Sequence, residues 1–94
     1  MFKVDYVELT RDVAQGKEHT LEMALRDAMN EAAGEELPLS ILFEQSKTIT
    51  KKVIEELKNL DFGNKPVSFT EDFFRGFFPN FIESFKRSYN SAKA

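Results

Sequence analysis

Apolar residues recur every three or four positions along most of the chain, the spacing that places side chains on one face of an α-helix. The longest such pattern predicts a helix over residues 38–60, about six turns long. Lysine and glutamate alternate along its other face, which is typical of a surface in contact with solvent. The apolar stripe of this helix consists of Leu39, Leu42, Phe43, Ser46, Ile49, Thr50, Val53, Leu57 and Leu60.

A shorter pattern predicts a helix over residues 20–33. Thr20 is expected to cap its N-terminus, because a threonine hydroxyl can accept a hydrogen bond from a free amide of the first turn. Gly34 is expected to end it, since glycine readily adopts the left-handed conformation that terminates helices. Glu22 and Arg26 are four positions apart and are expected to form an ion pair. The apolar face consists of Leu21, Leu25, Ala28 and Ala32.

Phenylalanine is concentrated in the last third of the chain. Thr70 is expected to cap a helix there, but Gly76 and Pro79 interrupt the pattern. Pro79 lacks an amide hydrogen and disfavours a helical backbone at the residue before it. We therefore predict two helices, residues 70–78 and residues 79–90, followed by a frayed tail over residues 91–94. The apolar positions of this segment are spaced by three and four: Phe73, Phe74, Phe77, Phe78, Phe81, Ile82, Phe85 and Tyr89.

Residues 2–9 fit two patterns. Apolar and polar side chains alternate at the start, as in a β-strand, but Val4 and Val7 also fit a helical face that continues to Val13. A strand there could pair only with residues 66–70, and a two-stranded pairing is marginal unless helices cover one face. The predicted fold is therefore a single compact domain of the mainly α class with three to four helices. The alternative is an α+β fold with this short pairing.

The 94 residues are enough for one domain, and their charge is unevenly distributed. Residues 1–36 hold nine acids and four bases, whereas residues 37–94 hold seven acids and nine bases. The net charge of −3 disfavours non-specific binding to nucleic acid, which requires clustered positive charge. Two interpretations stay open: the two parts attract each other weakly in the folded domain, or the first presents an acidic face to a basic partner.

Cysteine is absent, which excludes disulfides, thiolate metal sites and cysteine catalysis. A small domain without disulfides favours a reducing compartment, so we expect a cytoplasmic location. The N-terminal residues do not have the pattern of a signal peptide, and no segment reaches the roughly eighteen apolar residues that a membrane span requires. We therefore do not expect an integral membrane protein.

No residue pattern identifies a reaction. His19 is the only histidine, and its neighbours imply neither a zinc site nor an acid–base pair. Asp5, Glu8 and Asp12 would share one face of a helix, but the rest of a metal shell is missing. We predict that the protein is not an enzyme and that it has no catalytic, metal-binding or cofactor-binding residues.

The aromatic segment carries more apolar surface than one packed helix face requires. Its large apolar side chains span roughly half of a helical wheel, whereas packing on one side needs a stripe only a little over 100° wide. Either every ring belongs to the core, or the surplus binds a partner.

From this surplus we predict a protein-interaction module, regulatory, inhibitory or adaptor-like, as in many small intracellular or phage-type accessory proteins. It binds itself as a homodimer, or a larger protein. The alternatives, which the sequence favours less, are a nucleic-acid-associated regulator and peripheral membrane-surface binding by the C-terminal aromatic helix. The predicted protein-binding residues are Phe73, Phe74, Phe77, Phe78 and Phe81.

Overall fold

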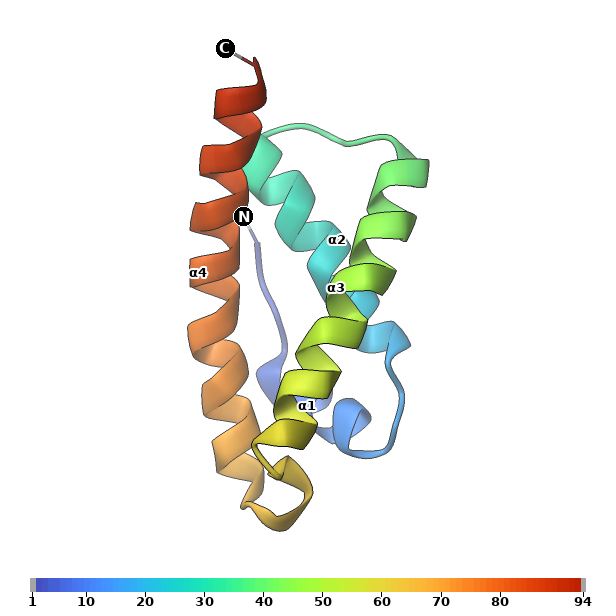
Figure 1. Cartoon of the computed structure of the whole chain (residues 1–94), viewed down its shortest axis with the longest axis vertical. Helices are drawn as coiled ribbons and strands as arrows, with labels where there is room; N and C mark the ends of the chain where they lie inside the picture. The colour runs from blue at the N-terminus through green and yellow to red at the C-terminus, as the bar shows by residue number, and fades with distance from the viewer. Residues whose placement is uncertain (1, 94) are drawn as a thin grey trace.

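The computed structural model describes residues 2–93, and this part of the chain forms four α-helices and no β-strand (Figure 1). A short 3-10 turn, η1, joins the last two helices. The mainly α prediction is therefore confirmed. The bounds are α1 Tyr6–Ala14, α2 His19–Ala33, α3 Leu39–Asn59, η1 Phe62–Asn64 and α4 Val67–Lys93.

Helix α2 lies at the centre of the arrangement. It packs against α3 on one side and against α4 on the other, and the short α1 packs against both α2 and α4. By contrast, α3 and α4 make at most marginal contact with each other. They come together near the η1 turn and diverge towards the other end of the molecule (Figure 1).

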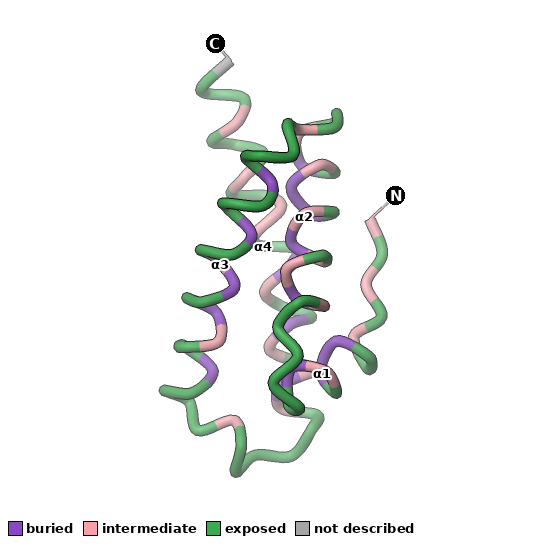
Figure 2. Tube along the Cα trace, turned by 90° about the vertical axis from the view of Figure 1, so that its right-hand side faces the viewer, coloured by how far each residue is buried: buried purple, intermediate pink, exposed green. Residues whose placement is uncertain are grey.

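The core consists of the side chains that the four helices direct towards one another. Two phenylalanines of α4, Phe74 and Phe78, are completely buried in it. Figure 2 shows the buried positions of α2 and α3 on the sides where these two helices face each other. Complete burial of one such side chain stabilises the fold by about 1.5–3 kcal/mol. The buried cluster contains Leu9, Val13, Leu21, Leu25, Ala28, Val53, Leu57, Phe74 and Phe78.

The crossing of α2 and α3 contains a polar contact. Ser46 is fully buried; its Oγ accepts a hydrogen bond from Nε of Arg26 at 3.1 Å and donates one to the carbonyl of Phe43 at 3.2 Å. The guanidinium of Arg26 also lies 4.3 Å from the centre of the Phe43 ring and 3.3 Å from Glu22. The predicted Glu22–Arg26 pair is therefore confirmed, and Ser46 serves as the hydrogen-bond partner of this arginine.

The helix ends agree with the sequence only in part. Gly34 adopts the left-handed conformation and ends α2, as predicted. The predicted cap at Thr20 is wrong, because α2 begins at His19 and the Thr20 hydroxyl donates instead to Asp12 at 2.6 Å. That bond ties the start of α2 to α1. Asp5 caps α1 by accepting a hydrogen bond from the amide of Glu8 at 3.1 Å.

The strand pairing of the alternative α+β fold does not form within residues 2–93. Residues 2–5 have no regular secondary structure, and residues 67–70 form the first turn of α4. The ring of Phe2 packs against that of Phe78, with 5.5 Å between their centres, so this segment lies against α4 without pairing to it. The Asp5 cap starts a helix where alternation suggested a strand, and Pro66 has the fixed φ that suits a residue preceding a helix.

The predicted division of the C-terminal segment into two helices is also wrong, because α4 continues through Pro79. A proline inside a helix costs about 3 kcal/mol. Phe74 and Phe78 are fully buried before the proline, and Phe81 and Ile82 pack against the same core after it. Their burial, at about 1.5–3 kcal/mol for each full side chain, outweighs the cost.

The surroundings of Pro79 also lower its cost. The carbonyl that loses its helical partner belongs to Arg75, one turn earlier, and both positions are exposed to solvent, where water can replace the missing donor. Thr70 is buried within the helix and is not its cap. The predicted frayed tail is helical as far as Lys93; Ala94 lies outside the described residues.

Replacing Pro79 with alanine is expected to raise the free energy of unfolding by about 1–3 kcal/mol, because it restores the helical hydrogen bond and removes a helix-disfavouring residue. Urea denaturation followed by far-ultraviolet circular dichroism measures the change. Lys86→Ala, on the same helix, is the control and should change stability only by a few tenths of a kcal/mol. An unchanged or lower stability of Pro79→Ala would contradict this account of α4.

Candidate protein-binding surface

Five aromatic side chains follow one another at intervals of four residues along α4 and form what we term the aromatic stripe. Neighbouring ring centres are 6.2, 5.7, 5.9 and 6.3 Å apart in order along the helix. Each of the five residues is half-buried. The stripe runs beside the core without belonging to its fully buried part. Its members are Phe73, Phe77, Phe81, Phe85 and Tyr89.

The first three rings of the stripe line a surface hollow of about 410 Å³ between α4 and α3, which we call the α3–α4 groove. The groove exists because α2 packs against both helices while they barely contact each other. Among the described residues, Glu56 from α3 is the one charged residue that lines it. The remaining lining comes from three small or short polar residues of α4: Gly76, Asn80 and Ser84.

The five residues predicted to bind a partner fall into two groups. Phe74 and Phe78 are completely buried. On the folded chain they cannot contact another molecule, and their role is to hold α4 to the core. Phe73, Phe77 and Phe81 are half-buried and line the α3–α4 groove. Binding of a partner by these three stays a prediction, now narrowed to the accessible rings.

The sequence did not reveal the other residues of the groove. Gly76 was interpreted only as an interruption of the helix, and Asn80 and Ser84 carried no signal on their own. Gly76, Asn80 and Ser84 are spaced by four, and each follows a ring of the aromatic stripe by three positions. On one helix this spacing could have placed them beside the stripe. Glu56 could not be assigned, because its position depends on how α3 and α4 are held by α2.

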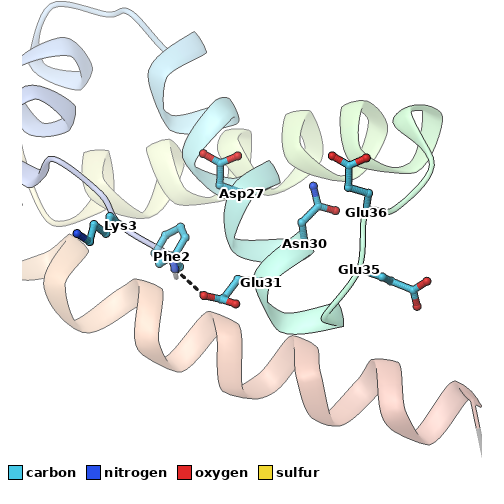
Figure 3. A pocket seen from close by; sticks show the side chains of 7 residues that line it. All are labelled: Phe2, Lys3, Asp27, Asn30, Glu31, Glu35 and Glu36. Atoms are coloured by element: carbon cyan, nitrogen blue, oxygen red, sulfur yellow. Dashed lines mark hydrogen bonds between the residues drawn. The ribbon is translucent and has the colours of Figure 1, made fainter.

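A second hollow, of about 470 Å³, is lined by several of the acidic residues from the first 36 positions of the chain (Figure 3). Its carboxylates are spread along the rim and do not converge (Figure 3). Within residues 2–93, no three histidine, aspartate or glutamate side chains are placed to hold a metal ion. The hollow is therefore an acidic surface without a metal site. Its lining residues are Phe2, Lys3, Asp27, Asn30, Glu31, Glu35 and Glu36.

The other charged residues singled out from the sequence have local contacts. Asp5 caps α1 and Asp12 accepts from Thr20, whereas His19 is exposed at the start of α2. Three ion pairs, Glu22–Arg26, Glu71–Arg75 and Glu83–Arg87, each join positions four apart on one helix. No helix among residues 2–93 is long and apolar enough to cross a membrane.

Comparison with known proteins adds no relative. No protein-family model matches the sequence, and no curated protein or solved structure matches it either. A function must therefore be argued from the residues of this chain and their arrangement.

Truncating the two groups of phenylalanines is expected to affect stability differently. Phe78→Ala removes a completely buried ring and should lower the free energy of unfolding by about 3–5 kcal/mol. Phe77→Ala removes a half-buried ring, so its cost should be about 1–2 kcal/mol. Urea denaturation at low protein concentration measures both.

If Phe78→Ala does not fold, Phe78→Leu provides the comparison, because it keeps an apolar side chain and should cost about 1–2 kcal/mol. Phe77→Leu is its matched control and should cost less than half as much. Equal costs at positions 77 and 78 would contradict the division into core rings and groove rings.

Proposed function

We propose that this protein is a protein-interaction module, regulatory or adaptor-like in kind, that self-associates through the part of the aromatic stripe lining the α3–α4 groove. The observation that carries the proposal is the position of Phe73, Phe77 and Phe81. All three are accessible, and they lie side by side in a hollow that the chain itself leaves unfilled.

The chemistry of the groove favours a protein partner. Aromatic side chains are enriched at protein interfaces, and the residues that dominate binding energy are commonly aromatic. No lysine or arginine is among the described residues that line the groove, which there lacks the positive charge that attracts nucleic acid or an anionic membrane surface. A helix with an apolar face is the natural occupant, because it can lie along a groove formed by two helices.

The half-burial of the rings limits the expected affinity. If a partner covers about 50 Å² more of each ring, each contributes about 1 kcal/mol at 25 cal/mol per Å². Six rings in a symmetric dimer then give about 7 kcal/mol, and association itself costs at least about 4 kcal/mol. The difference of at most about 3 kcal/mol corresponds to weak, reversible association with a Kd of a few millimolar.

Sedimentation equilibrium and light scattering over a series of concentrations test the proposal. The mass should rise with concentration from 10.8 kDa towards twice that value. Phe77→Gln should stay monomeric over the same range, because it places a polar group in the groove while leaving the buried Phe74 and Phe78 unchanged.

Leu39→Gln is the matched control, since Leu39 is 67% exposed but does not line the groove. It should associate like the unsubstituted protein. A chain that remains monomeric up to about 10 mM, above the Kd of a few millimolar that the ring estimate gives, would overturn the proposal. Equal loss of association in both variants would show that the groove is not the contact.

A further inference from the structure

Gly76 is a residue that the isolated chain does not explain. It lies well inside α4, where glycine is destabilising relative to alanine because it gains nothing from packing and loses more backbone freedom. A Cβ atom added at Gly76 would meet nothing within 4 Å, and its φ is not in the left-handed region. Neither a close neighbour nor a special backbone conformation within the described chain requires glycine here.

The position of Gly76 supplies the reason. It lines the α3–α4 groove together with Asn80 and Ser84, and these three follow one another at intervals of four residues. The row of Phe73, Phe77 and Phe81 has the same interval and runs beside it on the same helix. One face of α4 therefore presents a ridge of rings next to a channel of small or short side chains, and helices pack by fitting ridges of one into channels of another.

We propose that this channel receives α4 of a second copy of the chain in antiparallel orientation, so that an aromatic ring of the second copy packs on Gly76. The proposal rests on the proposed self-association and specifies its geometry. The two rows complement each other under a two-fold axis midway between Phe78 and Pro79. That axis places Phe81 of one copy over Gly76 of the second copy, Phe77 over Asn80, and Phe73 over Ser84.

This match is the reason for choosing a second copy as the occupant. In a two-fold symmetric interface the same surface serves both molecules, so every contact occurs twice. Here all three rings meet small or short side chains, and no ring meets a ring. Glycine opposite Phe81 allows the aromatic ring to lie directly on the backbone of the neighbouring helix, which a side chain at that position would prevent.

Gly76→Ala tests the inference because it should have opposite effects on folding and on association. At low protein concentration the variant should melt about 4–8 °C higher, because alanine is the better helix former and the added methyl group meets nothing in the chain. Its self-association should be weakened about tenfold, because the methyl group occupies the space of the ring of the second copy. Differential scanning calorimetry and sedimentation equilibrium measure the two quantities.

Asn90→Ala is the matched control, since it also places alanine at an exposed position of α4 but lies outside both rows. Its dimer Kd should be unchanged. If Gly76→Ala associates as tightly as the unsubstituted protein while Phe77→Gln does not associate, the Gly76 contact is overturned and the proposed function stands. If the unsubstituted protein never associates, the proposed function itself fails.

The orientation can be tested separately, because the chain has no cysteine of its own. A single cysteine at Asn80, close to the proposed axis, should form a disulfide-linked dimer on mild oxidation. One at Ser91, on the same side of the helix but far from the axis, should not. Equal cross-linking at both positions would indicate parallel helices and overturn the antiparallel arrangement.

Discussion

The burial of Phe74 and Phe78 is the constraint on which the rest of the structure depends. Both rings are completely buried in the core cluster that α1, α2, α3 and α4 share, and α2 is the helix that packs against all the others. Fixing these two rings fixes the rotation of α4 about its own axis. Phe73 and Phe77 precede them by one residue each, a rotation of about 100°, so they come to lie at the edge of the core and in the groove.

The same constraint explains why α4 tolerates residues that ordinarily disrupt helices. Pro79 and Gly76 both lower the intrinsic helix preference of the segment, and from the sequence they indicated a break. The apolar side chains before and after Pro79 must face the same core, and a break would separate them. Packing energy therefore determines the helix here, and local preference does not. The N-terminal segment shows the reverse, because the single side-chain cap at Asp5 starts a helix against an alternating pattern.

The sequence predicted the elements whose cause is local and periodic. The apolar spacing of three and four placed the buried faces of α2 and α3 correctly, and Gly34 marked the end of α2. The long stripe was overestimated, since Leu39, Phe43 and Leu60 are exposed. The groove could not be predicted, because spacing shows that a helix has an apolar face but not which helix covers it. Which rings are accessible depends on α3 and α4 both packing against α2 and not against each other.

The apolar surplus of α4 follows from this arrangement. A chain of 94 residues buries only about 60–65% of its unfolded surface, and here one central helix cannot cover two neighbours completely. A fold selected only for stability would fill the space between α3 and α4 or make their facing surfaces polar. Instead the groove combines accessible rings with a helix-interior glycine that packing within the chain does not require. The accessible rings lower the solubility of the isolated chain, and the glycine lowers its stability. A second helix in the groove would cover the rings and could pack closely on the glycine.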